Sequence, residues 1–424
     1  MNRKTVADIA RCIGGELLQS PHADEPVREL AFDSRRIRQG GGTLFFALVS
    51  QRNDGHRYIG ELYRKGVRHF VVNSEFADIQ SYPEADFIRT EDTLKALQTL
   101  AREHRKQFLL PVIGITGSNG KTTVMEWLYQ LLCDDYRITY TPNSFNSQIG
   151  VPISVWSLDR DSQLGIFEAG ISRPDEMATL ESIIRPTIGI LTNIGQAHNE
   201  FFMGIRQKIG EKLNLFRNVE TLVMSFDNGD VNEVLLRSGL AQRIRLFTWS
   251  RKRRESDLFV QEVKTEGQQT EITAVYQDNP ISIRIPFIDE AAIENVLHCW
   301  ACMLLLGYSN DRIAERMLLL CAVGTVVCMV LTMSNLGTVS LIALILNYLC
   351  EAIMFPTIFS LAVRDLGAQK KRGASLLMMT PIGGCGFLLM GWLADHTNPF
   401  LPFVVPLAGF AVVLAYAYYI DKRG

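Results

Sequence analysis

The chain has 424 residues, 21% of them charged, and a formal net charge of −2. This length allows about two to four domains, and the near-zero charge argues against a protein that binds nucleic acid over its whole surface. The charge is unevenly spread, because residues 1–316 carry nearly all of it and residues 317–424 are almost uncharged and apolar. The sequence therefore predicts a soluble head followed by an apolar tail.

Residues 1–108 alternate strand and helix patterns, with polar clusters at the strand ends and helix starts. Two such clusters are Asp33-Ser34-Arg35 and Asp54-Gly55-His56. They suit a ligand with phosphates or a uracil-like edge, and a solvated loop explains them equally well. The chain begins with an amphipathic stretch in place of the apolar core of a signal peptide, so we expect the head to be cytosolic.

A glycine-rich run follows at 114–123, reading Gly-Ile-Thr-Gly-Ser-Asn-Gly-Lys-Thr-Thr, between an apolar strand pattern and a helical pattern. Strand, glycine turn and helix form the context of a phosphate-binding loop, in which backbone N–H groups and the helix N-terminus bind an anion. Five residues separate Gly114 from Gly120 in place of the usual four, so the match is to a variant. We expect Lys121 to reach the outer phosphates and Thr122 to place its hydroxyl on Mg²⁺.

Two further polar residues follow buried strand patterns. Glu168 ends one apolar run, and His198 comes shortly after the next. Ligands of open parallel sheets bind at the carboxyl ends of the strands, so we expect Lys121, Thr122, Glu168 and His198 to converge there. A carboxylate, an imidazole and a hydroxyl suit Mg²⁺ beside nucleotide phosphates, although either Glu168 or His198 alone can be structural.

The apolar tail contains four stretches long enough to cross a bilayer, for which about 20 helical residues suffice. They lie at 317–334, 339–363, 374–393 and 400–420. With a cytosolic head, the basic clusters after the second and fourth stretches fall on the cytosolic side, as the positive-inside rule expects. The sequence thus predicts four transmembrane helices in the cytoplasmic membrane, and buried helices of a soluble domain are the alternative.

Several motifs of the head resemble the Mur ligases, in the branch that adds D-alanyl-D-alanine to UDP-N-acetylmuramoyl-tripeptide, in the form found fused to alanine racemase. The motifs are 114–123, 143–152, 168–170 and 192–198 for the central domain, 287–295 for its end, and Asp33-Ser34-Arg35 with Asp54-Gly55-His56 for the UDP-binding domain. The resemblance implies an α/β fold. It places a UDP-precursor-binding domain at 1–108, an ATP-binding P-loop domain with a mostly parallel sheet at 109–316, and leaves the all-α transmembrane segment at 317–424.

The resemblance also implies an activity, which is ATP-dependent amide ligation through an acyl phosphate that the amine of D-alanyl-D-alanine attacks. ATP and Mg²⁺ are the implied cofactors. The implied catalytic residues are Lys121, His198 and Lys212, with Lys212 as the family's carbamylated lysine and Lys208 as the competing choice. The implied nucleotide-binding residues are Gly117, Asn119, Gly120, Lys121, Thr122, Thr123, Asn146 and Asn295. Substrate binding is implied for Ser34, Arg35, Asp54 and His56, and magnesium ligation for Thr122, Glu168 and His198.

The tail departs from that family. The family's third domain, which contacts the nucleotide and the incoming amine, is expected after Arg316 and is replaced by the apolar stretches, so impaired ligation is predicted. Residues 350–363 resemble the last helices of a major-facilitator sugar permease of the fucose/glucose-galactose type. The alternative function is therefore a membrane transport protein fragment with a vestigial nucleotide-binding head. The sequence leaves the oligomeric state open.

Overall fold

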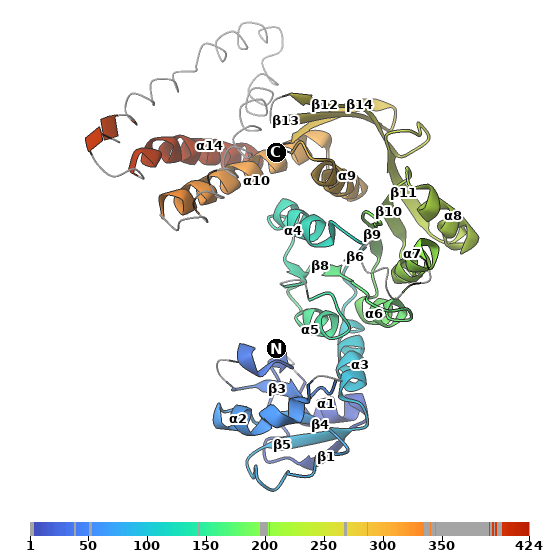
Figure 1. Cartoon of the computed structure of the whole chain (residues 1–424), viewed down its shortest axis with the longest axis vertical. Coiled ribbons are helices and arrows are strands. Elements are labelled where there is room, and N and C mark those ends of the chain that lie inside the picture. The colour runs from blue at the N-terminus through green and yellow to red at the C-terminus, as the bar shows by residue number, and fades with distance from the viewer. Residues whose placement is uncertain are drawn as a thin grey trace, which may run out of the picture. The chain divides into compact units, whose positions relative to one another are not determined.

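The computed structural model describes residues 4–334 apart from 38–39, 51–52, 143–144, 196–201, 203, 267–268 and 286, together with 340, 344, 390, 392–393, 395–396 and 401–423. It divides into two units (Figure 1). The first comprises Met1–Met125, Cys133–Leu222 and Asp230–Arg245, and the second comprises Glu126–Leu132, Val223–Gly229 and Leu246–Gly424. Each unit is described by itself.

The first unit begins with a five-stranded sheet. Its strands are β1 (Glu16–Gln19), β2 (Glu29–Ala31), β3 (Thr43–Phe46), β4 (His69–Asn73) and β5 (Asp86–Thr90), in the order β1-β5-β4-β3-β2. Strands β2 to β5 run parallel, and β1 pairs antiparallel with β5. Successive side chains of a strand point to opposite faces, so Leu44 and Phe46 enter one core cluster while Phe45 enters the other.

Short helices complete this part of the first unit. They are α1 (Val6–Ile13), the 3-10 turns η1 (Ser34–Arg36) and η2 (Gly55–Tyr58), α2 (Ile59–Arg64) and α3 (Thr93–Arg105). Helix α1 starts at a capping box in which the Thr5 side chain accepts from the Asp8 amide and Asp8 accepts from the Thr5 amide. It ends at Gly14, whose φ of 65° glycine adopts without strain.

The phosphate-loop part of the first unit is built on parallel strands. They are β6 (Val112–Thr116), β7 (Ile138–Tyr140), β8 (Leu164–Glu168) and β9 (Ile188–Leu191), in the order β9-β6-β8-β7. The residues of β6 and β8 are all buried, as expected for the central strands of a parallel sheet. The elements around them are α4 (Lys121–Leu132), α5 (Gly150–Trp156), α6 (Met177–Ile184), α7 (Ile205–Leu213), η4 (Asn214–Phe216), β10 (Thr221–Ser225), α8 (Gly229–Arg237) and η5 (Leu240–Gln242).

Helix α3 joins the two sheets of the first unit, and in Figure 1 it lies against α5 and α6. The buried Arg105 guanidinium donates to three backbone carbonyls, those of Ile184 at 2.8 Å, Phe108 at 2.6 Å and Arg185 at 3.1 Å. One turn earlier, Arg102 Nε donates to Ser182 Oγ at 3.0 Å. These bonds satisfy the open carbonyls at the end of α6 and hold the N-terminal sheet against the phosphate-loop part.

The second unit contains β11 (Arg245–Ser250), β12 (Leu258–Glu266), β13 (Gln269–Tyr276) and β14 (Asn279–Ile285), paired in that order. Strand β11 is parallel to β12, and the other two pairs are antiparallel. Helix α9 (Glu290–Leu305) buries Trp300 and His298, and His298 Nδ1 accepts a hydrogen bond from Trp249 Nε1 at 3.2 Å. Burial lowers the pKa of His298 to about 3, so this side chain is a neutral core acceptor.

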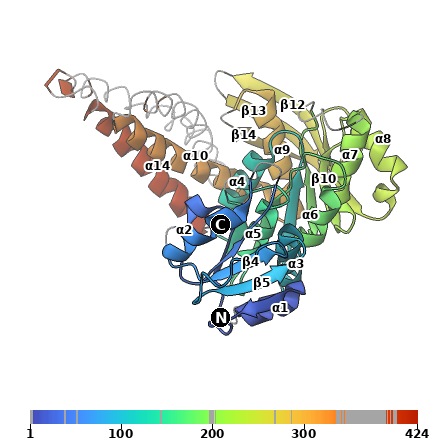
Figure 2. The ribbon, with the colours of Figure 1, turned by 60° about the horizontal axis from the view of Figure 1, so that its bottom comes forward.

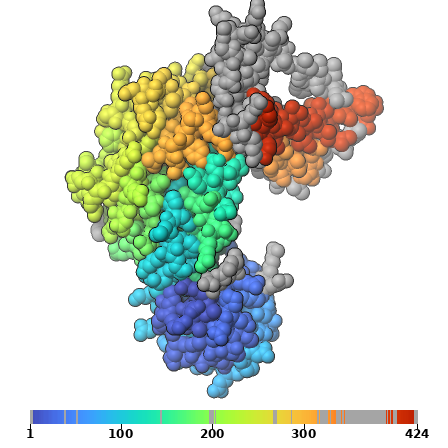
Figure 3. Space-filling view, turned by 180° about the vertical axis from the view of Figure 1, so that it is seen from behind, coloured from blue at the N-terminus to red at the C-terminus, as the bar shows by residue number. Residues whose placement is uncertain are grey.

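The tail elements that the structure describes are α10 (Asn310–Met333), η8 (Leu401–Phe403) and α14 (Val404–Arg423). Helices α10 and α14 lie side by side in Figures 1 and 2, and Figure 3 shows their atoms in contact. Within the described residues, Leu401–Tyr419 is the one helical stretch whose length and hydropathy suit a membrane crossing, and 17% of it is buried. The predicted span at 400–420 matches it, 317–334 falls in α10, and 339–363 and 374–393 lie almost wholly outside the described residues.

The expected α/β class with mostly parallel sheets is confirmed. The expected four-helix transmembrane segment finds support in a single apolar helix. The domain limits at residues 108 and 316 stay predictions.

Candidate nucleotide-binding site

The glycine-rich loop lies between the end of β6 and the first residue of α4, as the sequence predicts. Gly117 is required by space, because a Cβ there would lie 1.9 Å from Thr192 Oγ1. Gly120 has φ +82°, a backbone conformation that L side chains rarely adopt. The Thr192 hydroxyl donates to the Asn119 carbonyl at 2.7 Å and thereby fixes the loop on the end of β9.

Glu168, the last residue of β8, is buried beside this loop. Thr122 Oγ1 donates to Glu168 Oε2 at 2.7 Å, and Asn146 Nδ2 donates to Glu168 Oε1 at 2.5 Å. The Glu168 amide donates to Thr141 Oγ1 at 3.0 Å, which fixes the backbone that carries the carboxylate. Sequence reasoning thus brought Thr122, Glu168 and Asn146 to one place, although the hydrogen bonds among them were not expected.

The residues present fit a magnesium ion. A hydroxyl and a carboxylate, here 2.7 Å apart, are oxygen ligands of the kind that Mg²⁺ prefers. Across the parts of the chain that the structure describes, no group of three or more His, Cys, Asp and Glu side chains is placed to hold a metal. The expected third ligand, His198, lies outside the described residues, so the described donors are Thr122 and Glu168 alone.

Three lysine side chains converge on the loop, one from α4 and two from α7. Their ammonium groups donate to backbone carbonyls, Lys121 to Ser118 at 3.2 Å, Lys208 to Gly195 at 2.6 Å and Lys212 to Gly117 at 2.8 Å. Lys208 is 2% exposed and Lys212 is 4% exposed. Lysine is almost never so deeply buried unless it has a partner, and here each ammonium has a carbonyl partner. The three lysines together place positive charge beside the loop, where phosphates are expected.

The pKa values of these lysines respond to that burial. Desolvation, together with the positive charges of Lys121 and Lys208, lowers the pKa of Lys212 to about 7, and the Glu168 carboxylate opposes this shift. Desolvation also lowers the pKa of Lys121 and, with repulsion from Lys121, that of Lys208. With this pKa, about half of the Lys212 side chains are neutral amines near pH 7, and the neutral amine is the form that reacts with electrophiles.

The other expected nucleotide-binding residues are less closely defined. Thr123 is half-buried in the first turn of α4, and the Asn119 carbonyl accepts the hydrogen bond from Thr192. Asn295 lies on α9 in the second unit, so its nucleotide contact stays a prediction.

The expected substrate residues of the first unit have partners within their own domain. Asp33 accepts from the Arg35 amide and pairs with its guanidinium at 2.8 Å, while Ser34 is buried. The Arg35 side chain is 86% exposed. The neighbouring Arg36, which the sequence analysis did not single out, lies 4.5 Å above the ring centroid of Phe145. No pattern in the sequence indicates that pair, because its two residues lie far apart in the chain.

His56 uses both ring nitrogens inside the N-terminal sheet domain. Its Nδ1 lies 2.6 Å from Asp54 Oδ1, and its Nε2 accepts from the Asn73 amide at 3.1 Å. The ring also stacks on Phe76 with 5.4 Å between centroids. These contacts stabilise the η2 turn, and the substrate-binding roles of Asp54 and His56 stay predictions.

Comparison with known proteins shows what this arrangement is similar to. Residues 115–303 match the family model of the Mur ligase middle domain. A crystal structure of MurF from Acinetobacter baumannii superposes with a TM-score of 0.65 at 23% identity, covering 74% of this chain and 67% of that one. The first unit and the strands that follow it therefore have the α/β Mur ligase fold.

The relatives narrow the comparison to one kind of Mur ligase. The UDP-N-acetylmuramoyl-tripeptide--D-alanyl-D-alanine ligase of Bacillus subtilis is 27% identical over 317 residues, covering 74% of this chain and 66% of that protein. The same-named ligase of Treponema pallidum is 36% identical over 215 residues, 49% of this chain and 46% of that protein. A Thermotoga maritima MurF structure in complex with ADP is 25% identical with a TM-score of 0.58, covering 67% of this chain and 64% of that one.

The chain thus spans between about half and two thirds of the length of these relatives. Because the relatives are ligases, the alternative of a transport protein fragment is not favoured. The resemblances to the form fused to alanine racemase and to a sugar permease stay predictions.

Proposed function

We propose that this chain is an ATP-dependent amide ligase that joins D-alanyl-D-alanine to UDP-N-acetylmuramoyl-tripeptide, a step in peptidoglycan precursor synthesis. One observation carries the proposal, the convergence of Lys121, Lys208 and Lys212 on a glycine loop beside the Thr122–Glu168 pair. The names of the relatives support the substrates, and the ADP complex of the Thermotoga maritima protein supports the nucleotide.

The loop residues take the phosphate roles in this proposal. The ammonium of Lys121 binds outer phosphate oxygens, and the loop amides around Gly117 and Gly120 cradle the inner ones. Thr122 and Glu168, with His198, hold Mg²⁺, which when bound neutralises phosphate charge. Asn146 positions Glu168 through its 2.5 Å hydrogen bond.

The reaction then runs in two balanced steps. The terminal phosphoryl group passes from ATP to the tripeptide carboxylate, giving an acyl phosphate and ADP. The amine of D-alanyl-D-alanine attacks the acyl carbon, inorganic phosphate leaves, the amine loses a proton and an amide bond forms. The protein contributes positioning and charge neutralisation, for which a rigid loop with buried cations is suited.

Lys212 has a separate part in the proposal. Its neutral amine can add to CO₂ and lose a proton, which gives a carbamate anion among the cations of the site. The depressed pKa, about 7, favours this reaction near neutral pH. The carbamate would offset the charges of Lys121 and Lys208.

For the other substrate we propose the N-terminal sheet domain. Ser34 and Arg35 sit at η1, beside the Arg36–Phe145 pair that bridges the two sheets of the first unit. An exposed guanidinium such as that of Arg35 suits a diphosphate. In this proposal Asp54 and His56 also help to bind the precursor, and Asn295 contacts the nucleotide.

We also propose that the head is cytoplasmic and that the tail holds it at the membrane. Support comes from the apolar helix Leu401–Tyr419 and from exposed side chains on it, among them Val412 and Tyr418. Fractionation of cells that express the whole chain tests this. Extraction by alkaline carbonate would contradict a spanning tail, and release by detergent alone would agree with it.

The function is tested with the whole chain in detergent, UDP-N-acetylmuramoyl-tripeptide, D-alanyl-D-alanine and MgATP. We expect ADP release and the joined product, identified by mass, to require all three substrates, and Lys121→Ala to lower the rate about a hundredfold or more. The control is Lys106→Ala, which removes an exposed lysine paired with Glu103. Equal nucleotide binding by the wild type and Lys121→Ala, or ADP release that ignores the dipeptide, would refute the proposal.

A further inference from the structure

Two neighbouring residues between β7 and α5 contact different parts of the first unit. The Phe145 ring lies beneath the Arg36 guanidinium, with 4.5 Å from the guanidinium carbon to the ring centroid, and meets the Phe32 ring in a T-shaped contact at 6.2 Å between centroids. Asn146, the next residue, donates from Nδ2 to Glu168 Oε1 at 2.5 Å. One short segment therefore contacts both the η1 region, where the precursor is proposed to bind, and the carboxylate that is proposed to hold magnesium.

The backbone of this segment is held in place at both residues. The Phe145 amide donates to the Pro142 carbonyl at 3.1 Å, and the Asn146 carbonyl accepts from the Gly170 amide at 2.7 Å. Gly150 approaches the segment so closely that a Cβ there would lie 2.6 Å from the carbonyl carbon of Phe145. Closely packed groups transmit displacement, so a shift of the Phe145 ring would move the Asn146 side chain.

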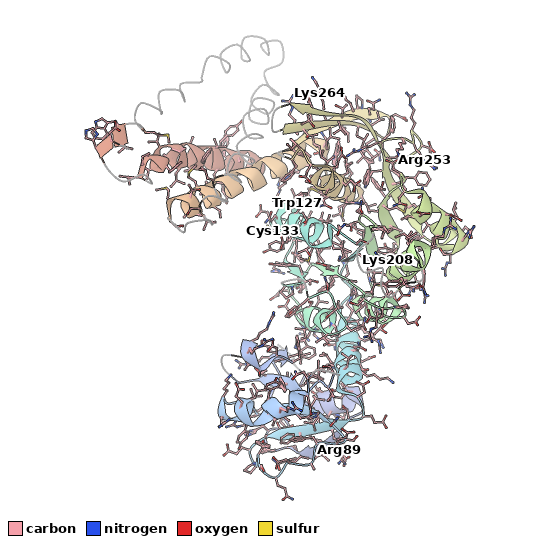
Figure 4. The ribbon with its side chains drawn as sticks, viewed as in Figure 1. Arg89, Trp127, Cys133, Lys208, Arg253 and Lys264 are labelled. Carbon is pink, nitrogen blue, oxygen red and sulfur yellow. The ribbon has the colours of Figure 1, made fainter. Side chains whose placement is uncertain are left out.

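At the other end of these contacts, the Glu168 carboxylate has a defined orientation. Its Oε2 accepts from Thr122 Oγ1 at 2.7 Å, and its Oε1 accepts from Asn146. This carboxylate lies beside the glycine loop on which the three lysines converge, and Lys208 among them is labelled in Figure 4. Asn146 therefore helps to fix the group that is proposed to hold Mg²⁺ at the nucleotide phosphates.

The proposed reaction makes the spacing between these two places important. The precursor carboxylate has to meet the terminal phosphorus of ATP with attacking and leaving oxygens roughly in line, and a misplacement of about 1 Å can lower a rate about a hundredfold. Arg36 lies in η1 of the N-terminal sheet domain, whereas Glu168 ends β8 in the phosphate-loop part. Phe145 and Asn146 connect the two through direct side-chain contacts.

We propose that Phe145 is a positioning residue for the ligation, whose ring sets the spacing between the precursor-binding η1 turn and the Glu168 carboxylate. This inference rests on the proposed function. The ring touches no reacting group and acts through Asn146 and Arg36. Its loss should therefore lower kcat at saturating substrates, whereas a residue that only binds a substrate would raise KM and a residue that only supports the fold would lower the melting temperature.

Steady-state ADP release by the whole chain in detergent, with UDP-N-acetylmuramoyl-tripeptide, D-alanyl-D-alanine and MgATP, gives kcat and KM for each variant. For Phe145→Leu, which replaces the ring by a smaller aliphatic group, we expect kcat to fall about tenfold to a hundredfold and the KM for MgATP to change less than about threefold. Phe145→Tyr keeps a ring beneath Arg36 and should recover most of kcat. Arg36→Met removes the cation–π contact and should lower kcat about twofold to fivefold.

Phe108→Leu is the matched control, because Phe108 is also a half-buried phenylalanine of the first unit and packs on another ring, that of His104. It should leave kcat unchanged. A Phe145→Leu chain with the kcat of this control, or one in which only a KM rises, would overturn the inference while leaving the proposed function in place. A wild-type chain that releases no ADP would refute the proposed function and the inference with it.

Circular dichroism melting of each variant separates a defect in positioning from a defect in folding. If Phe145→Leu fails to fold, the kcat of Arg36→Met decides, since Arg36 is exposed and its replacement leaves the Phe145 ring in place. A kcat below that of Phe108→Leu would agree with the inference, and an equal kcat would overturn it.

Discussion

Lys212 should destabilise the fold that it serves, and its replacement by methionine should therefore stabilise the protein. In the folded state the pKa of Lys212 is about 7, against 10.5 for an ordinary lysine. Between these values the unfolded chain binds more protons at this residue than the folded one, so stability rises with pH across that window. The destabilisation is complete below about pH 7 and is lost as the pH approaches 10.5.

The size of the effect follows from the same shift. A pKa difference of this size corresponds to about 4 kcal/mol at pH 7, since each pKa unit is worth about 1.4 kcal/mol. Lys212→Met also removes the 2.8 Å hydrogen bond to the Gly117 carbonyl, which costs about 1 kcal/mol. We therefore expect Lys212→Met to raise the free energy of unfolding by about 3 kcal/mol near pH 7 and by nothing near pH 10.

Urea titrations followed by circular dichroism, in buffer free of carbonate so that Lys212 is not carbamylated, measure this difference. Wild type and Lys212→Met are compared near pH 7 and near pH 10. Lys106→Met, at an exposed lysine, controls for the removal of any lysine. If the difference in free energy of unfolding between wild type and Lys212→Met does not change with pH, the reasoning is refuted, since the buried charge of Lys212 would not be the source of that difference.

Two other predictions concern the frame of the site. Gly117→Ala should abolish nucleotide binding and lower the melting temperature, because its Cβ would lie 1.9 Å from Thr192 Oγ1. Gly41→Ala is the control, because a Cβ there meets nothing within 4 Å. Normal ATP binding by Gly117→Ala in calorimetry would contradict the prediction. Arg105→Met should lower the free energy of unfolding by about 3 kcal/mol, since one buried and two part-buried hydrogen bonds to backbone carbonyls are lost. An unchanged urea midpoint would contradict this and show that water replaces the guanidinium.

The parts of the site that lie at strand ends could be predicted from the sequence. Thr122 and Glu168 meet because β6 and β8 are adjacent parallel strands, with Ile115 in register with Glu168. This follows from the rule on carboxyl ends of strands. The glycine loop was likewise predictable, since its strand and helix are contiguous with it.

Contacts between distant elements could not be predicted in the same way. The Lys208–Gly195 bond depends on how α7 is oriented against the loop after β9. The Arg36–Phe145 contact depends on how η1 packs against the segment between β7 and α5. Neither has a local pattern. In the tail, the sequence predicted more than the structure supports. Hydropathy and loop charge predicted four membrane spans, and Leu401–Tyr419 is the one that the described residues support.

The bonds of Arg105 have a mechanical consequence. Its guanidinium donates hydrogen bonds to the carbonyls of Ile184 and Arg185, and β9 begins at Ile188, a few residues later. A rotation of the N-terminal sheet would therefore displace β9, the strand that leads to Gly195. If the proposed function holds, the parts of the first unit that bind precursor and nucleotide would therefore move as one rigid body.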